Sequence, residues 1–233
     1  MTRPTIISIE GNIGSGKSTF IKKLEEYYNL YDGKNVYFLG EPVEEWLEIK
    51  DEDGEHILSK FYNDQEKYSF SFQIMAYISR LNKLKNAINE IGKKDNNAVI
   101  FTERSLMTDK YVFAKMLYDE QKMEKIEYTI YNKWFDSFNK ETEVDKIIYI
   151  SSNPQICFER VKLRARNGEN DIPLEYLTNC SNYHDSMINK VNKETITIDG
   201  NKNIYKDPTI LLSWFHEIDK LINKKNRDYK YLM

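Results

Sequence analysis

A glycine-rich segment near the N-terminus has the residue types and the spacing of a phosphate-binding loop. Residues 11–18 read Gly-Asn-Ile-Gly-Ser-Gly-Lys-Ser, which fits the pattern G-x-x-x-x-G-K-[ST]. In such a loop backbone N–H groups surround phosphate oxygens, the lysine reaches the β- and γ-phosphates, and the last hydroxyl binds Mg²⁺. The pattern therefore predicts ATP as phosphate donor and Mg²⁺ as cofactor. The loop residues expected to bind ATP are Gly11, Asn12, Ile13, Gly14, Ser15, Gly16, Lys17, Ser18 and Thr19.

The loop alone does not name a reaction, because GTPases, motor ATPases and small-molecule kinases all use it. Glu41 and Glu103 each follow a short apolar run, at the strand ends where open α/β sheets bind ligands. Phosphoryl transfer to an alcohol needs a carboxylate that orients or deprotonates the hydroxyl, and positive charge on the transferred group. Glu41 and Glu103 are therefore candidates for the base and the metal ligand. We expect Arg104 and Lys17 to complete the catalytic group.

Three arginines further along the chain have a spacing that suits a phosphate clamp. Arg160 and Arg164 are i, i+4 neighbours on a predicted helix, and Arg166 follows near its end. The next residues, 167–171, read Asn-Gly-Glu-Asn-Asp, a polar segment suited to a lid that closes on a nucleotide. We therefore expect a lid at about residues 160–171, whose arginines bind the ATP phosphates.

The elements that must position these residues alternate along the chain. Short β-branched runs predict strands, and apolar residues spaced three and four apart predict helices, most clearly over residues 70–91. The apolar strands indicate a parallel sheet buried on both faces. We expect an α/β protein with a three-layer P-loop kinase fold: a five-stranded parallel sheet, helices on both faces, an arginine-bearing lid, and one domain over residues 1–233. The predicted strands are residues 5–10, 36–39, 98–102, 146–150 and 195–198.

Charge and composition exclude other classes of protein. The chain has 37 acidic and 34 basic residues, so it lacks the basic excess typical of a nucleic-acid partner. No apolar run is long enough to span a bilayer, and we expect no signal or transit peptide before the first strand. We therefore expect a cytoplasmic protein without a membrane partner. Cys157 and Cys180 have no metal-ligand spacing and are expected to be free thiols.

With these motifs in order, the sequence resembles the deoxyribonucleoside kinases, in particular the deoxycytidine, deoxyguanosine and deoxyadenosine kinase branch. The resemblance rests on residues 9–19, on Glu41-Pro-Val and on Glu103-Arg-Ser. It covers roughly residues 6–199, and the tail beyond Asp199 matches weakly. Further matching positions are Trp46, Phe72 with Gln73, Arg80, Asp109, the arginine lid and residues 172–177.

This resemblance implies a role for each matching residue. Glu41 would bind the 5′-hydroxyl of a deoxynucleoside and act as base, with Glu103 and Ser18 near Mg²⁺, although Glu103 stays a second candidate for the proton acceptor. Arg104 would hold the 5′-oxygen and the transferred group. The resemblance also implies a homodimer. Substrate contacts would come from Tyr62 and Glu169 to the 3′-hydroxyl, Gln73 to the base edge, and Trp46 and Phe113 on the two faces of the base.

Each of these substrate contacts has a simpler alternative. Trp46 and Phe113 could be core residues, Gln73 could cap a helical turn, and Tyr62 could be a surface tyrosine.

The pair Arg80 and Asp109 indicates which base is preferred. In the resembling deoxycytidine and purine kinases such a pair contacts the base, whereas thymidine-accepting relatives carry an apolar and a small residue there. Mispaired polar groups discriminate more strongly than a lost methyl contact, so we expect deoxyadenosine, deoxyguanosine or deoxycytidine over thymidine. The alternative is that Arg80 is a surface residue paired near Glu90. The chain departs from human-type relatives at Gly168, where they carry an acid, which would loosen lid closure.

Two other functions compete with this prediction. A nucleoside monophosphate kinase such as thymidylate kinase would use Arg80 for an acceptor phosphate, but Glu41 would repel that phosphate. A non-catalytic nucleotide-binding partner subunit of a kinase would be expected to lose Lys17, Glu41 or Arg104, and all three are present.

Overall fold

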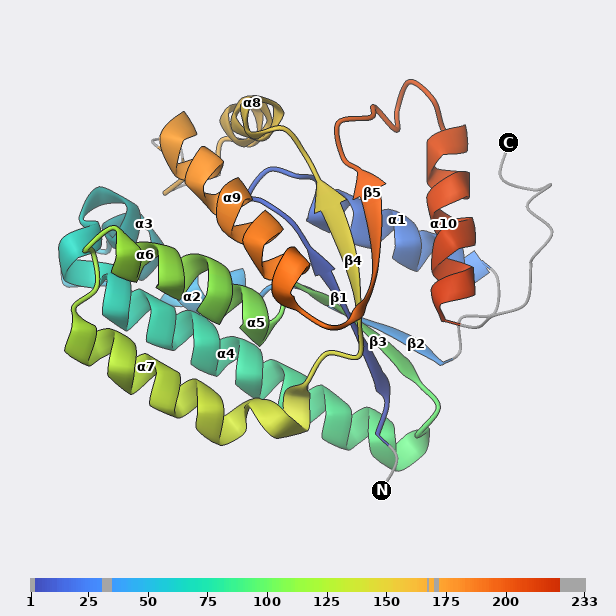
Figure 1. The fold of residues 1–233 in the computed structure, drawn as a ribbon, viewed down its shortest axis with the longest axis horizontal. Coiled ribbons are helices and arrows are strands. Elements are labelled where there is room, and N and C mark those ends of the chain that lie inside the picture. Colours follow the sequence, from blue (N-terminus) through green and yellow to red (C-terminus); the bar gives the residue numbers. More distant parts are fainter. Residues whose placement is uncertain (1–2, 31–34, 167, 170–171, 223–233) are drawn as a thin grey trace.

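The computed structural model describes residues 3–30, 35–166, 168–169 and 172–222. At their centre lies a five-stranded parallel sheet in the order β2-β3-β1-β4-β5 (Figure 1). Two strands thus lie on one side of β1 and two on the other, and Ile7 of β1 is in register with Phe101 and Lys146. The strands are β1 (Thr5–Glu10), β2 (Val36–Leu39), β3 (Val99–Glu103), β4 (Lys146–Ser151) and β5 (Glu194–Asp199).

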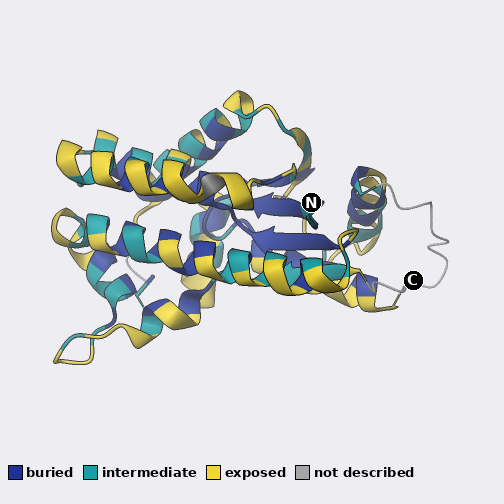
Figure 2. Cartoon of the chain, turned by 90° about the horizontal axis from the view of Figure 1, so that it is seen from below, coloured by how far each residue is buried: buried dark blue, intermediate teal, exposed yellow. Residues whose placement is uncertain are grey.

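Helices cover both faces of this sheet, as predicted. Successive side chains of a strand point to opposite faces, and β1 illustrates the consequence. Ile7 belongs to a core cluster with Phe20 of α1 (Lys17–Leu30) and Phe215 of α10 (Thr209–Leu221). Ile6 belongs to another cluster with residues of α4 (Gln65–Lys94) and α9 (Leu174–Lys190). Figure 2 shows the buried strands between these helices. The three-layer α/β fold is confirmed.

The expected strands are present: β1 and β2 have the predicted bounds, and the ends of the other three differ by one residue. The predicted helix over residues 70–91 starts earlier, because Asp64 caps α4 by accepting a hydrogen bond from the Lys67 N–H. Strand β3 is one residue later than predicted and includes Glu103, so this carboxylate belongs to the sheet itself. The other helices are α2 (Val43–Glu48), α3 (Ile57–Asn63), α5 (Leu106–Thr108), α6 (Lys115–Asp119), α7 (Lys125–Phe138) and α8 (Pro154–Arg164).

One helical segment has an unexpected form. The structure has a π-helical segment, η1, at Asp109–Ala114, followed directly by α6. A π-helical segment changes the direction of its side chains relative to an α-helix, and such segments are frequent at functional sites. Here it contains Asp109 and Phe113, two of the predicted substrate contacts.

In the described part of the chain no helix is both long and apolar enough to cross a membrane. The lid residues 167, 170 and 171 and the tail from residue 223 lie outside the described residues.

Candidate active site

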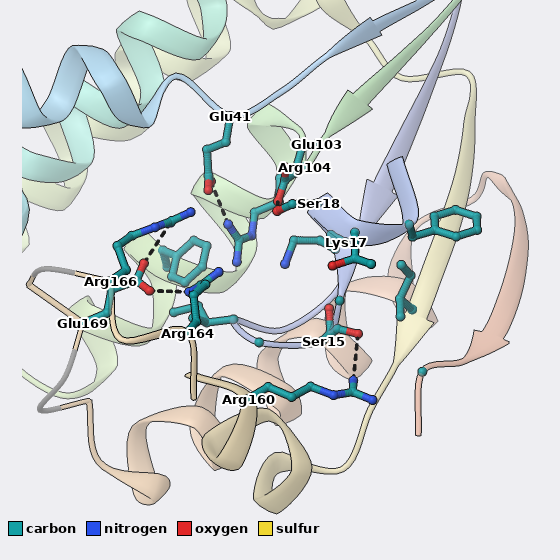
Figure 3. Close-up of a pocket in the computed structure, with 18 of the residues that line it drawn as sticks. Ser15, Lys17, Ser18, Glu41, Glu103, Arg104, Arg160, Arg164, Arg166 and Glu169 are labelled. Carbon is teal, nitrogen blue, oxygen red and sulfur yellow. Dashed lines mark hydrogen bonds and ion pairs between the residues drawn. The ribbon is translucent and has the colours of Figure 1, made fainter. Parts of the chain in front are cut away.

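A cavity of about 500 Å³ opens at the carboxyl ends of the strands (Figure 3). It gathers nearly all the predicted site residues, which come from nine different segments of the chain. Gly11 and Asn12 do not line it. The predicted residues in its wall are Ile13, Gly14, Ser15, Gly16, Lys17, Ser18, Thr19, Glu41, Trp46, Tyr62, Gln73, Arg80, Glu103, Arg104, Asp109, Phe113, Arg160, Arg164, Arg166 and Glu169.

The glycine-rich loop joins β1 to α1 and is shaped by its own backbone. Gly14 has φ +78°, and a Cβ atom there would lie 2.4 Å from the Cys157 carbonyl oxygen, so only glycine fits. Asn12 lies behind the loop, where its side chain donates a hydrogen bond to the Leu177 carbonyl at 2.7 Å. The Asn12 side chain thus has a structural contact, and the expected contact of Asn12 with ATP stays a prediction. The buried Ser15 hydroxyl has no hydrogen-bond partner among the described residues and is available to a ligand.

Lys17 begins α1 and is only 4% exposed. Its ammonium group donates to the Asn12 carbonyl oxygen at 2.7 Å. Burial, and after it the positive charge of Arg104, lower the pKa of Lys17 to about 7, against the opposing effect of Glu103 and Glu41. A phosphate group at this position would supply the negative charge that the buried lysine lacks.

Four buried charged side chains form the wall opposite the loop. One carboxylate oxygen of Glu41 binds Arg104 at 2.7 Å and Arg80 at 2.9 Å. Arg80 also donates to Asp109 at 2.9 Å and to the Glu103 carbonyl oxygen at 2.7 Å. The predicted pair of Arg80 with Asp109 is thus present, whereas the alternative of a surface arginine is wrong, because Arg80 is 6% exposed. The pairing of both arginines with Glu41 was not predicted.

This arrangement determines the charge state of Glu41. Burial alone would raise the pKa of its carboxyl, but Arg104, Arg80 and Lys17 outweigh burial and hold that pKa well below its ordinary value. Glu41 is therefore ionised over the whole physiological range. The buried Nε of Arg104 has no partner among the described residues, so this guanidinium is not saturated by Glu41.

Ser18 and Glu103 lie together at the base of the loop. The Ser18 hydroxyl donates to a Glu103 carboxylate oxygen at 2.8 Å. Among the described residues no three His, Cys, Asp or Glu side chains gather as metal ligands. Mg²⁺ is usually bound by one or two protein oxygens, with water and substrate phosphates completing its shell. A hydroxyl and a carboxylate beside a phosphate loop fit this requirement.

Aromatic side chains form the far end of the cavity. Trp46 donates from its indole N–H to the Ser79 hydroxyl at 2.9 Å and packs edge-on against Phe72 at 5.4 Å. It therefore lines the cavity and is also part of the core. The Arg104 guanidinium lies 5.2 Å from the centre of the Phe113 ring. Gln73 is 2% exposed in the middle of α4, so it caps no turn, and its side-chain oxygen has no partner among the described residues.

Tyr62 lies in α3 between the aromatic end and the lid. It lines the cavity, so the alternative of a surface tyrosine is wrong. Burial raises the pKa of its hydroxyl well above the ordinary value, and the negative charge of Glu169 raises it further. Tyr62 is therefore a neutral hydrogen-bonding group beside an acidic one.

The arginines predicted for the lid lie at and beyond the end of α8, where Ala165 adopts a left-handed conformation. Arg160 donates to the Ser15 carbonyl oxygen at 3.3 Å, next to the phosphate loop. Arg164 and Arg166 both bind the Glu169 carboxylate, Arg166 at 3.1 Å. Glu169 therefore pairs with lid arginines in this structure, whereas the sequence predicts a contact with the sugar.

Gly168 lies close to α3, and its expected effect on lid closure stays a prediction. It has φ +85°, and a Cβ atom there would lie 3.0 Å from the His56 ring and 3.3 Å from Ser59. His56 caps α3 by accepting a hydrogen bond from the Ser59 N–H at 3.0 Å, a role that the sequence did not suggest. The glycine thus lets the lid pack closely on α3, the helix that carries Tyr62.

Two groups in or near the site were missed from the sequence. The segment between β5 and α10 lines the cavity with residues such as Asn203, Ile204 and Tyr205, although its polar composition matches no motif. Glu10 ends β1 directly before the loop and is completely buried. The sequence could have pointed to Glu10, because it is an acidic residue at the end of an apolar strand, as Glu103 is.

Comparison with known proteins identifies the family. A family model described as deoxynucleoside kinase matches residues 7–223, so the likeness extends beyond Asp199, where a weak match was expected. Human deoxycytidine kinase is 36% identical over 203 residues, covering 80% of this chain and 76% of the relative. The mitochondrial deoxyguanosine kinase of Xenopus laevis is 31% identical over 221 residues, covering 89% and 80%. A probable deoxycytidine kinase of fowlpox virus is 34% identical over 195 residues, covering 82% and 75%. The chain belongs to the deoxynucleoside kinase family.

Proposed function

We propose that this deoxynucleoside kinase transfers the γ-phosphoryl group of ATP directly to the 5′-hydroxyl of a deoxyribonucleoside, giving the 5′-monophosphate for nucleotide salvage. The observation that carries the proposal is one cavity in which a phosphate loop with Lys17 faces Glu41, itself held by Arg104 and Arg80. A carboxylate so placed suits a neutral hydroxyl acceptor. The two guanidiniums suit the charge that develops on the transferred group.

The donor end follows from the loop and the lid. Ser15, Lys17 and the loop N–H groups would bind the ATP phosphates, together with Arg160, Arg164 and Arg166. Ser18 and Glu103 would hold Mg²⁺, which when bound neutralises charge on the β- and γ-phosphate oxygens. The lowered pKa of Lys17 supports this assignment. Burial disfavours the positive charge of Lys17, and bound phosphates would stabilise that charge.

Glu41 would orient the 5′-hydroxyl and accept its proton. A carboxylate with a strongly lowered pKa is a weak base, but phosphoryl transfer depends more on position and charge stabilisation than on early proton removal. Arg104 binds Glu41 in this structure and would be drawn to the transferred group during the reaction, which would raise the basicity of Glu41. Glu103 is the second candidate for proton acceptor, but its hydrogen bond with Ser18 favours the metal role.

The base would be read at the buried end of the cavity. The Gln73 side-chain oxygen without a partner suits an amino group of the base, and Arg80 with Asp109 supplies further donors and acceptors. This chemistry favours deoxycytidine, deoxyadenosine or deoxyguanosine over thymidine. The names of the deoxycytidine and deoxyguanosine kinases similar to this chain support the same choice. Trp46 and Phe113 would enclose the base, while Tyr62 and Glu169 would bind the 3′-hydroxyl.

The competing functions have less support. A monophosphate kinase such as thymidylate kinase would bring an acceptor phosphate beside Glu41, a carboxylate that stays ionised. A non-catalytic subunit would not need the complete set of Lys17, Glu41 and Arg104 in one cavity. Deoxynucleosides as acceptors fit both observations.

We further propose that the chain, residues 1–233, acts as one domain and forms a homodimer through α7. Four apolar side chains at intervals of four residues stay exposed along this helix. They form a continuous stripe that a second copy would cover. Sedimentation of the wild type and of Trp134→Glu tests this, with a dimer expected for the first and a monomer for the second. The stripe consists of Ile126, Ile130, Trp134 and Phe138.

The cytoplasmic location stays a prediction.

Product analysis tests the proposed reaction. With Mg²⁺, ATP and deoxycytidine, we expect a ³¹P NMR signal of a phosphomonoester coupled to the two 5′-methylene protons. Deoxycytidine lacking its 5′-hydroxyl serves as control and should give no product, while ATP stays intact. A phosphate attached to the 3′-oxygen, or ATP hydrolysis without a nucleotide product, would contradict the proposal.

A further inference from the structure

Glu10 is a buried acidic residue for which the mechanism above has no use. It is the last residue of β1 and is 0% exposed. Its carboxylate accepts a hydrogen bond from the Ser105 hydroxyl at 2.6 Å and another from the Thr108 hydroxyl. A buried carboxylate is costly unless it is fully hydrogen-bonded, so these two hydroxyls are its main stabilising partners in the described structure.

The two hydroxyls belong to the ends of one very short helix. Ser105 immediately precedes α5 and Thr108 is its last residue. A serine in this position commonly caps the helix with its side chain, but here the Ser105 side chain makes no capping bond and donates to Glu10. Glu10 therefore holds both ends of α5 against the end of β1.

Two of the proposed site residues flank this segment. Arg104 precedes Ser105, and Asp109 follows Thr108. Arg104 has φ +62°, a conformation that is strained for a residue other than glycine and persists only where its surroundings enforce it. Its N–H donates to the Ile9 carbonyl oxygen at 3.0 Å, and its own carbonyl oxygen accepts from the Thr102 hydroxyl at 2.8 Å.

We propose that Glu10 is a positioning residue that aligns Arg104 with Glu41 through Ser105, and Asp109 with Arg80 through Thr108. The inference rests on the proposed function, in which Arg104 acts on the transferred group and Asp109 on the base. One carboxylate, placed directly before the phosphate loop, thus fixes the turn that carries the catalytic arginine and the start of the segment that reads the base.

Ser8 provides the matched control for a role limited to filling the core. It lies two residues before Glu10 on β1, so its side chain points to the same face of the sheet. It is also 0% exposed, but its hydroxyl has no hydrogen-bond partner among the described residues. Ser8→Ala removes a buried polar atom of the same strand and breaks no hydrogen bond to α5.

The hydrogen bonds of Glu10 with Ser105 and with Thr108 can be tested separately, the first by kcat and the second by base preference. For Ser105→Ala we expect kcat to fall on the order of tenfold, because small displacements of a catalytic group are costly, with the preference between bases unchanged. For Thr108→Val we expect a several-fold rise of thymidine relative to deoxycytidine in kcat/KM, with a smaller change of kcat. Glu10→Gln should show both effects, because a neutral amide strengthens neither hydrogen bond by its charge, and its NH2 group forces one of the two hydroxyls to accept instead of donate. Ser8→Ala should show neither.

Some outcomes overturn the inference. If Glu10→Gln lowers Tm but leaves kcat and base preference unchanged, Glu10 has only a role in stability. If the only change is a higher KM for ATP, Glu10 acts through the phosphate loop and the proposed route is wrong.

A crystal structure of Glu10→Gln separates this inference from the proposed function. We expect Arg104 to leave its positive φ and its contact with Glu41 to lengthen beyond hydrogen-bonding distance. An unchanged Arg104 in that crystal overturns the inference whether or not the wild type phosphorylates nucleosides. A wild type that phosphorylates no nucleoside overturns the proposed function, and the crystal then decides the role of Glu10 alone.

Discussion

The arginines at the two ends of the cavity are held in different ways. Arg80 and Arg104 are 6% and 5% exposed and share the buried carboxylate of Glu41. The side chains of Arg164 and Arg166 are 35% and 31% exposed, and both bind Glu169. Removing one member of a buried charge network leaves an uncompensated charge. At the lid, only the arginines are partly exposed, and Glu169, whose side chain is 7% exposed, keeps one arginine when the other leaves. The proposed acceptor end is thus held by a buried network, and we expect the proposed donor end to exchange its partners when phosphates bind.

This comparison predicts its largest effect for Glu41→Gln. The change removes the group that orients the hydroxyl and breaks the contacts of two arginines, so kcat should fall by roughly 10²–10⁴ with a smaller change in nucleoside affinity. Steady-state kinetics with Glu44→Gln, an exposed residue of α2, as control measures this. A kcat within a factor of about three of the wild type would contradict the role of Glu41.

A second change tests whether the buried network also selects the base. The double substitution Arg80→Met with Asp109→Ala removes both members of a buried pair and opens space for the thymine methyl group. The ratio of kcat/KM for thymidine to that for deoxycytidine should rise roughly 10- to 100-fold. Asp109→Ala alone, which leaves Arg80 bound to Glu41, should give a smaller shift. An unchanged ratio in the double variant would refute the proposed base selection.

The pKa of Lys17 predicts that ATP binding takes up protons. In the free protein Lys17 has a pKa of about 7, lowered by burial and Arg104, so it is mostly neutral at pH 8 and mostly charged at pH 6. Phosphates bind the charged form, so uptake should approach about one proton at pH 8, and affinity should fall up to about tenfold per pH unit above 7.

Calorimetry in buffers of different ionisation enthalpy measures this uptake. Lys17→Arg is the control, since arginine stays charged across the range and should lose the uptake that Lys17 causes. Equal uptake by both proteins at pH 8 would show that Lys17 is already charged before ATP binds.

The smallest effect is expected at the lid. Arg166→Gln removes a partly exposed charge, so KM for ATP should rise roughly two- to fivefold while kcat changes little. The rise in KM should be smaller at high salt, because salt screens exposed charges. Lys190→Gln, an exposed residue at the end of α9, is the control. A fall in kcat as large as that of Glu41→Gln would mean that the two ends of the cavity do not differ as described.

Contiguous features could be predicted from the sequence, and features built from distant segments could not. Residues 11–18 form the phosphate loop because its geometry depends on neighbouring residues. Arg80 and Asp109 could be paired by family resemblance, but the shared contact with Glu41 joins positions from different elements.

The lid shows the same limit. The tight packing of Gly168 against His56 depends on how the lid lies on α3, which no local pattern encodes. The π-helical form of Asp109–Ala114 was missed because its apolar spacing resembles that of a regular helix.

The most direct test of the central claim is an ATP-consumption assay with Mg²⁺ and five acceptors in parallel: deoxyadenosine, deoxyguanosine, deoxycytidine, thymidine and thymidine monophosphate. The account predicts turnover with at least one of the first three and little with thymidine. Turnover with thymidine monophosphate alone would contradict it and indicate a monophosphate kinase. No turnover with any of the five would contradict the catalytic role itself and indicate a non-catalytic subunit.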